Sequence, residues 1–504
     1  MVQINLLLLM ALGAAMIGVS SRILVTPLIW FGMAFVLHAS RSMPVVRGSA
    51  CLWCVTYVAL FISQRGVIPA AGGIYFAVIA VLASTTILPF VIDRLVIQKS
   101  TALGPTMTFP IVWVAVEFLR SRFVPGATWG SIAYTQYGWL TLMQMAAFAG
   151  IAGIAFLIAW FASTLQWAWN HGFQWNAVRT PVLIYVVTFT LIILAGAIRI
   201  SMAPTDRPSL RVATLNRPID LFIPGEMTRI TEGNVTPEQK AKVNEKLTRL
   251  HDWFLEGSRR EAHAGARLIV WPEQNLLVFA EHETNFLERA RQLAAEERVF
   301  LAMGMGTIHL GEKFPFENKL VLIDPLGHIL FSYRKSHPVE GWEAGIMRVG
   351  DKQVPIATTA EQRMAGAICY DADFPEFIRQ AGEGGADLLI VAANDWKEIK
   401  YLHFQMQAFR AIENGVSLVR AAVLGMSAAV DPWGRVLGMT DYFAPGDRTL
   451  ITQLPIGGFR TLYSRTGDLF AWLCVAGFVL VLSNLLRQRL FSRSGHIAQQ
   501  RASC

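Results

Sequence analysis

The distribution of apolar residues divides the chain into two kinds of sequence. Long runs with almost no charge fill residues 1–200 and 469–486, whereas residues 205–465 alternate apolar and polar positions as a globular domain does. A membrane span needs about 20 mostly apolar residues. We therefore expect an N-terminal transmembrane bundle over 1–200, a second domain over 205–465 and a C-terminal transmembrane helix over 469–486. About seven spans are predicted in the bundle, at roughly 4–20, 23–39, 49–63, 69–92, 104–120, 139–167 and 180–198.

Basic residues predict how these spans are oriented. Lys and Arg collect on the cytoplasmic side of membrane proteins. Residues 487–504 follow the last apolar run and contain Arg487, Arg489, Arg493 and Arg501. This segment is therefore expected to be a basic cytoplasmic tail. Counting back through one C-terminal and seven N-terminal spans places the domain at 205–465 on the extracytoplasmic side.

Within residues 205–465, short apolar runs alternate with amphipathic segments. Strands are predicted at 210–216, 267–273, 299–306, 363–371, 387–395 and 416–423, and helices at 237–262, 283–297, 375–384 and 401–414. Thr236 before Pro237 is a typical start of a helix. Asp-Pro-x-Gly turns inside 318–335 and 427–439 predict two β-hairpins. About 250 residues of mixed strands and helices indicate one layered α/β domain.

Composition supports this division and excludes several functions. Only 16% of the residues are charged, against about 25% in a typical soluble domain. The net charge of +8 does not indicate a nucleic-acid partner, because no face combines basic and aromatic residues. No group of His, Cys, Asp and Glu has the spacing of metal ligands, so neither a metal nor another cofactor is expected. His337 and His403 stand alone in the sequence, which favours packed or surface positions.

Three reactive side chains come where predicted strands end. Glu273 follows the strand RLIVW, Lys335 follows ILFSYR, and Cys369 follows RMAGAI. Ligands of α/β sheets bind beyond the carboxyl ends of the strands. Taken alone, Cys369 is more typical of a packed thiol, since cysteine is among the most buried residues. A thiol becomes a good nucleophile when a cation or a base activates it, and Lys335 and Glu273 would supply both.

These residues also carry a resemblance to a known family. The motifs VWPE, YRKSH and ICYD place Glu273, Lys335 and Cys369 at separations of 62 and 34 residues and resemble the Glu-Lys-Cys triad of the nitrilase superfamily. The likeness continues in Asn394-Asp395-Trp396, in HFQMQAFRAIENG and in DPWGRVLG. Joined to membrane spans on both sides, the chain resembles bacterial apolipoprotein N-acyltransferases over nearly its whole length. The resemblance implies a nitrilase-like αββα sandwich attached to a helical bundle in the bacterial inner membrane.

The resemblance implies a role for individual residues. Cys369 would be the nucleophile, Glu273 the general base and Lys335 the oxyanion stabiliser. Supporting roles fall to Glu343, Tyr370 and Asp371, and substrate contacts to Trp396 and His403. The implied reaction transfers an acyl chain from a phospholipid, through a thioester, to the N-terminal amine of a diacylglyceryl-cysteine lipoprotein. The alternative is a membrane-anchored amidase or hydrolase acting on a C–N bond, in which water resolves the acyl-enzyme.

Some positions depart from the family's pattern. Residues 338–343 are PVEGWE where the family usually has Val-Pro-Phe-Gly-Glu, so Glu340 competes with Glu343 for the supporting role. Asp371 stands where the family usually has Glu. The apolar stretch DLFIPGEM at 220–227 is a candidate lid, and ordinary packing at the domain edge is an equal alternative for it.

Overall fold

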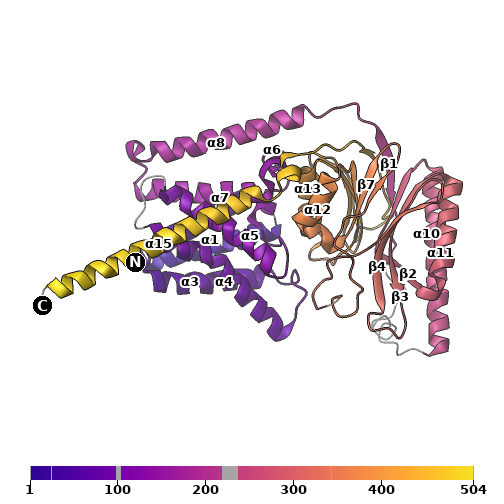
Figure 1. Ribbon diagram of the computed structural model, residues 1–504, viewed down its shortest axis with the longest axis horizontal. Coiled ribbons are helices and arrows are strands. Elements are labelled where there is room, and N and C mark those ends of the chain that lie inside the picture. Colours follow the sequence, from indigo (N-terminus) through magenta and orange to yellow (C-terminus); the bar gives the residue numbers. More distant parts are fainter. Residues whose placement is uncertain (1, 24, 98–103, 218–235, 342, 503–504) are drawn as a thin grey trace. The chain divides into compact units, whose positions relative to one another are not determined.

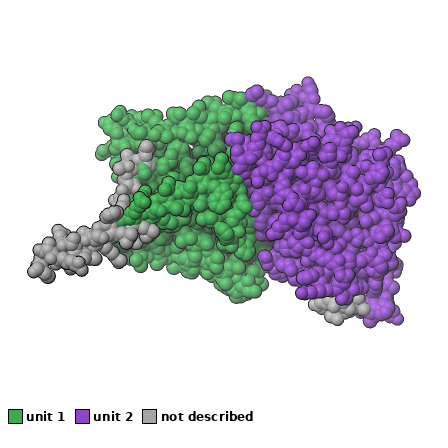
Figure 2. Space-filling model, in the orientation of Figure 1, with its two compact units in different colours: residues 1–201, 468–504 green, residues 202–467 purple. Residues whose placement is uncertain are grey.

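The chain forms two compact units, residues 1–201 with 468–504 and residues 202–467 (Figure 2). The computed structural model describes residues 2–23, 25–97, 104–217, 236–341 and 343–502, and within these ranges it describes side chains for residues 4–484 and for Arg487. The candidate lid at 220–227 lies outside the described residues.

The first unit is helical (Figure 1). Its long helices are α1 (Val2–Ile23), α2 (Thr26–Ser42), α3 (Val45–Ser63), α4 (Gly72–Val96), α5 (Gly104–Phe123), α7 (Ala146–Asn170), α8 (Trp175–Ser201) and α15 (Leu469–Ala502), with the short η2 (Ile132–Gln136) and α6 (Leu140–Met143) between α5 and α7. Each predicted span overlaps one of these helices. Among the described residues, α1, α3, α4, α7 and α8 are long and apolar enough to cross a membrane. The chain is therefore a multi-pass membrane protein, and the count of seven N-terminal spans stays a prediction.

A buried ion pair ties several of these helices together. In α2, Nε and an NH2 group of Arg41 each donate to the carboxylate of Asp93 in α4 at 2.8 Å. The same guanidinium donates to the carbonyl oxygen of Pro105 at 3.0 Å and to Gln166. Charged groups among membrane helices are costly unless they are paired. Each charge of this pair neutralises the other, which fixes α2, α4, α5 and α7 in one arrangement.

The second unit contains two six-stranded mixed sheets. The first has the order β12 (Leu450–Pro455), β1 (Ser209–Thr214), β2 (Leu268–Phe279), β3 (Phe300–Ile308), β4 (Phe316–Ile323), β5 (Ile329–Arg334). The second has the order β11 (Val436–Asp441), β10 (Met426–Val430), β9 (Ser417–Val423), β8 (Leu388–Asn394), β7 (Arg363–Ile368), β6 (Ile356–Thr358). Strands β1–β3 and β7–β9 run parallel, and the outer pairings are antiparallel. The sheets stack face to face, with β2 against β8 and β9.

Helices cover the outer face of each sheet, which completes the predicted αββα sandwich (Figure 1). α10 (Pro237–His263) and α11 (Ala280–Glu297) pack on the first sheet, and α13 (Lys400–Asn414), beside α12 (Pro375–Glu383), packs on the second. The predicted cap of α10 is present, because Thr236 Oγ1 accepts the backbone N–H of Gln239. Further along α10, Leu250 and Phe254 join Trp271 in the core of the first sheet. Amphipathic periodicity thus determines which face of α10 is buried.

One strand differs from the prediction at a position that matters for the site. The expectation that the strand at 267–273 ends at Glu273 is wrong. β2 resumes pairing with β3 at Leu276 after a shift of register that begins behind Trp271. Gln274 in this bulge has φ +53°. Behind the bulge, a Cβ on Gly304 would lie 2.5 Å from the carbonyl oxygen of Pro272, so β3 needs glycine there. The bulge turns Glu273 out of the regular alternation of the strand.

Candidate active site

Glu273 and Lys335 form a buried ion pair between β2 and the residue that follows β5. Lys335 Nζ lies 2.8 Å from Glu273 Oε1, and both side chains are at most 2% exposed. Lys335 also donates to Glu343 Oε2 at 2.7 Å. One ammonium group therefore lies between two carboxylates, and two of its three N–H bonds are directed at them.

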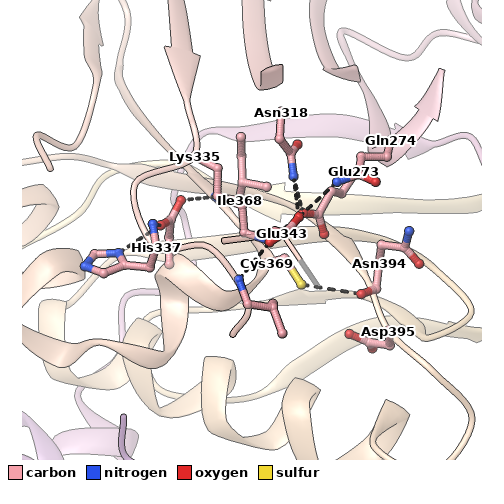
Figure 3. A network of polar contacts seen from close by, with 12 residues as sticks. Glu273, Gln274, Asn318, Lys335, His337, Glu343, Ile368, Cys369, Asn394 and Asp395 are labelled. Carbon is pink, nitrogen blue, oxygen red and sulfur yellow. Dashed lines mark hydrogen bonds and ion pairs between the residues drawn. The ribbon is translucent and has the colours of Figure 1, made fainter. Parts of the chain in front are cut away.

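Two amide side chains complete this arrangement (Figure 3). Asn318 Nδ2 donates to Glu273 Oε1 at 2.6 Å and to Glu343 Oε1 at 3.2 Å. Gln274 Nε2 donates to Glu343 Oε1 at 3.0 Å. Glu340, the rival for the supporting role, is exposed. We call Glu273, Asn318, Lys335 and Glu343 the lysine cluster.

Glu273 is suited to accept a proton. Its Oε2 atom is buried and has no hydrogen-bond partner among the described residues. Burial raises the pKa of Glu273, the nearby Glu343 carboxylate raises it further, and Lys335 opposes both. A carboxylate with a raised pKa and a free oxygen binds a proton more readily than an ordinary glutamate.

Cys369 lies at the end of β7, as predicted, where the chain turns into the short helix η3 (Cys369–Asp373). Its φ is +48°, a conformation that non-glycine residues adopt only at a cost in free energy. Its Sγ contacts the carbonyl oxygen of Asn394 at 3.5 Å (Figure 3). Burial raises the pKa of Cys369 well above its usual value, the charge of Glu273 adds to this, and Lys335 lowers it. The thiol is thus within the electrostatic influence of both Glu273 and Lys335.

Asp371 links the cysteine turn to the segment that carries Lys335. Its Oδ1 accepts the backbone N–H groups of Ser336 and His337 at 3.2 and 2.8 Å and lies 2.9 Å from His337 Nδ1. Its Oδ2 accepts Tyr333 Oη–H at 2.8 Å. A carboxylate that accepts so many donors fixes the backbone that follows Lys335 and the side chain of Tyr333 that precedes it. Sequence reasoning did not find Tyr333, although a tyrosine two residues before the lysine was a visible signal.

The other predicted site residues fall into different surroundings. Tyr370 is half-buried and packs edge-on against Phe374, with ring centroids 5.1 Å apart. Trp396 is half-buried and follows Asp395 in the loop after β8. His403, in contrast, is 2% exposed, with ring nitrogens 2.6 Å from Asp395 Oδ1 and 3.0 Å from Asp373 Oδ1. Its ring is engaged by protein groups, so the structure does not place His403 to contact a substrate.

His403 belongs to a second buried group of polar side chains. Arg420 in β9 donates from NH2 to both oxygens of Asp395 at 2.8 Å and from Nε to Gln407 Oε1 at 2.7 Å. We call this set the histidine cluster: Asp373, Asp395, His403, Gln407 and Arg420. In the sequence, the signal for the histidine cluster was Arg420, a lone arginine in the apolar strand VSLVRAAV.

One combination of these residues has the elements of a metal site. Cys369 Sγ, an oxygen of Asp395 and a nitrogen of His403 lie within 4.8 Å of one another, the one such group among the described residues. Both oxygens of Asp395 accept from Arg420, however, and both nitrogens of His403 face carboxylates. A cation would have to displace the guanidinium, so this arrangement fits an ion-pair network better than a metal site.

The two stacked sheets, their helical layers and the buried cysteine beside a lysine–carboxylate cluster define a carbon–nitrogen hydrolase domain of the nitrilase superfamily. Residues 234–462 match the family described as carbon-nitrogen hydrolase, and residues 8–164 match the one described as apolipoprotein N-acyltransferase N-terminal domain. A solved structure of an amidase from Nesterenkonia sp. is similar over 51% of this chain and 94% of its own, at 22% identity and a TM-score of 0.40.

Curated relatives match both parts of the chain. An apolipoprotein N-acyltransferase of Geobacter metallireducens is 28% identical and is covered over 92% of each chain. Another, from Bradyrhizobium diazoefficiens, is 27% identical over 82% of this chain and 79% of its own. The chain is thus similar to apolipoprotein N-acyltransferases in both of its parts.

Proposed function

We propose that this chain transfers an acyl group from a phospholipid to the N-terminal amine of a diacylglyceryl-cysteine lipoprotein, through a thioester on Cys369. The observation that carries the proposal is the buried lysine cluster beside Cys369, in a chain whose relatives are named apolipoprotein N-acyltransferases. Glu273, Lys335 and Cys369 form the catalytic triad in this proposal, and Glu343, Tyr370 and Asp371 support it. No cofactor takes part.

In the first half-reaction, Glu273 Oε2 takes the proton of the Cys369 thiol as sulfur attacks the ester carbonyl carbon. Lys335 still has one N–H bond beyond the two directed at carboxylates, and it donates this bond to the oxyanion. One such donor contributes roughly 3–4 kcal/mol to the transition state. The C–O bond to glycerol then breaks, Glu273 returns its proton to the leaving oxygen, and a lysophospholipid departs.

In the second half-reaction, the amine of the lipoprotein attacks the thioester carbonyl carbon. The C–S bond breaks, and Glu273 moves one amine proton to the departing sulfur, which restores the thiol. Both substrates are anchored in a membrane, and so is the enzyme. Confinement to one surface raises their effective concentration near the site. Trp396, half-buried in the loop after β8, is the proposed substrate contact.

The two half-reactions can be tested separately. The full chain in detergent is incubated with a phospholipid, and intact mass spectrometry should detect one added acyl group, lost on treatment with hydroxylamine. Adding a diacylated lipopeptide should discharge it and give a triacylated peptide. The variant Cys369→Ala should give neither product while retaining its melting temperature. Acylation of Cys369→Ala to the same extent would refute the assignment of the nucleophile.

The amidase alternative predicts a different result in the same assay. Water would resolve the acyl-enzyme, so free fatty acid, or ammonia from a simple amide, would appear and the lipopeptide would stay diacylated. The relatives' names favour transfer to an amine.

We further propose that the chain lies in the bacterial inner membrane with residues 202–467 on the extracytoplasmic side. Four arginines in α15, after its apolar stretch Leu469–Asn484, support a cytoplasmic C-terminus. Protease added to sealed right-side-out vesicles should cut within 202–467, and protease added to inverted vesicles should not. The opposite pattern would reverse the orientation.

A further inference from the structure

The histidine cluster is buried next to the candidate active site, and the proposed reaction does not use it. The five residues of this cluster are at most 2% exposed. They come from η3, the loop after β8, α13 and β9. Interactions between charges are stronger in such a buried network than in water, so its charge affects the groups around it.

Two carboxylates lie against the ring nitrogens of His403. Its Nδ1 lies 2.6 Å from Asp395 Oδ1, and its Nε2 lies 3.0 Å from Asp373 Oδ1. An imidazolium carries an N–H on each ring nitrogen and so suits both carboxylates, whereas a neutral imidazole would present a lone pair to one of them. Gln407 Nε2 also lies 2.9 Å from His403 Nε2. Burial lowers the pKa of His403, but the charges of Asp373 and Asp395 outweigh this and raise it to about 9.

Protonated His403 makes the histidine cluster neutral. The charged groups that face it are Asp373 from η3, Asp395 from the loop after β8 and Arg420 from β9, with the uncharged Gln407 on its own helix. Two carboxylates are then balanced by one imidazolium and one guanidinium. Without the proton on His403, a net charge of −1 would be left beside the thiol.

The cluster contacts the nucleophile in two ways. Cys369 Sγ lies within 4.8 Å of an oxygen of Asp395 and of a nitrogen of His403, and the Asp395 charge raises the pKa of the thiol. Gln407 Nε2 donates to the backbone carbonyl oxygen of Cys369 at 3.4 Å, and Gln407 is itself held by Arg420. The cluster therefore affects both the charge near the sulfur and the backbone of a residue with positive φ.

We propose that His403, held protonated between Asp373 and Asp395, is a positioning residue that neutralises the carboxylates beside Cys369 and so keeps the thiolate accessible to the reaction. The inference rests on the proposed role of Cys369 as nucleophile. It assigns His403 an electrostatic role in place of the substrate contact that the family resemblance implied.

The test measures the reactivity of the thiol and not the acyl transfer. The full chain in detergent is treated with iodoacetamide from pH 6 to 11, and alkylation of the Cys369 peptide is quantified by mass spectrometry. His403→Gln removes a positive charge and should shift the profile up by about one pH unit, the size expected for a charge at this distance. Asp395→Asn removes a negative charge and should shift it down. The double variant restores neutrality and should return the profile towards the wild type.

The matched control is His251→Asn, which changes another buried histidine of the same unit, bonded to the carbonyl oxygen of Leu277. Its profile should match the wild type at a comparable loss of melting temperature. The inference is overturned if both single variants shift in the same direction or if neither shifts. It is also overturned if His251→Asn shifts the profile as His403→Gln does. The two proposals can fail separately. If the single variants shift in opposite directions but the wild type forms no thioester, the proposed function is refuted and the effect of His403 on the thiol stands.

Discussion

The lysine cluster and the histidine cluster are both buried, both contain two carboxylates and both lie beside Cys369, yet their charges differ. The lysine cluster has one cation, Lys335, for Glu273 and Glu343, and so has a net charge of −1 when both are ionised. With His403 protonated, as proposed, the histidine cluster has two cations for Asp373 and Asp395 and is neutral. Oε2 of Glu273 has no hydrogen-bond partner among the described residues.

Because of this difference, the lysine cluster can change its protonation at a lower cost in free energy than the histidine cluster. Taking up one proton brings the lysine cluster to neutrality, whereas losing or gaining one would leave the histidine cluster charged. A buried net charge is expensive because the interior solvates it poorly. The lysine cluster is thus suited to move protons, and the histidine cluster to hold a constant field around the thiol.

The largest effect is expected from removing the only cation of the lysine cluster. Lys335→Met leaves two buried carboxylates together and deprives the oxyanion of its donor, so acyl transfer should fall by at least about 1,000-fold. Turnover of labelled phospholipid measures this. The control is Lys319→Met, which removes another buried lysine of the same sheet, paired with Glu283 and Glu317. Equal losses in the two variants would contradict a specific role of Lys335.

The next effect tests whether the lysine cluster moves protons. Glu273→Gln keeps an acceptor for Lys335 and Asn318 but cannot take the proton of the thiol, so the rate of thioester formation should fall by about 100- to 10,000-fold. Single-turnover acylation followed by intact mass gives this rate. A rate close to the wild type would mean that another group is the base.

A smaller effect should distinguish the two glutamates that compete for the supporting role. Glu343→Gln removes a like charge from Glu273, which lowers the pKa of Glu273, so the acid limb of the pH–rate profile should move to lower pH. A weaker base also reduces turnover, by about tenfold. Glu340→Gln changes an exposed side chain and should leave both quantities unchanged. A shift of the acid limb in Glu340→Gln would reverse this assignment.

The smallest effect concerns stability. Because folding raises the pKa of His403 from 6.5 to about 9, its contribution is fully present below pH 6.5 and is lost as the pH rises through about 9. The melting temperature should therefore fall more steeply over this window in the wild type than in His403→Gln, as measured by thermal unfolding in detergent. Parallel curves for the two proteins would show that His403 is not protonated in the folded state.

Much of the second unit could be predicted because its signals are local. Apolar alternation, the cap at Thr236 and the Asp-Pro-x-Gly turns act within about ten residues, and each predicted strand and helix overlaps an observed one. The strands β6 and β12 were missed because their pairing is long-range or at a sheet edge: β12 adds to β1 across some 240 residues of chain.

The site was predictable in part for the same reason. Strand ends and spacing indicated Glu273, Lys335 and Cys369, whereas Asn318 and Arg420 act through partners that only the tertiary fold brings close. Their signal was a polar residue inside an apolar strand, which indicates that a partner exists but not which one. The bulge in β2 left no local sign except Pro272, which cannot donate a hydrogen bond to the ladder.

The ion pair between Arg41 and Asp93 constrains how the first unit is made. The two residues are 52 positions apart, and a ribosome adds about 5–20 residues per second. Asp93 is therefore synthesised about 3–10 s after Arg41, and the guanidinium has no partner carboxylate during this interval. Over that time α2 has to stay near water or near lipid headgroups, because an unpaired guanidinium is costly inside the bilayer. Insertion of α4 is thus the step after which α2 can take its final depth in the membrane. A substitution of Asp93 would therefore impair membrane insertion of the protein before it could affect catalysis.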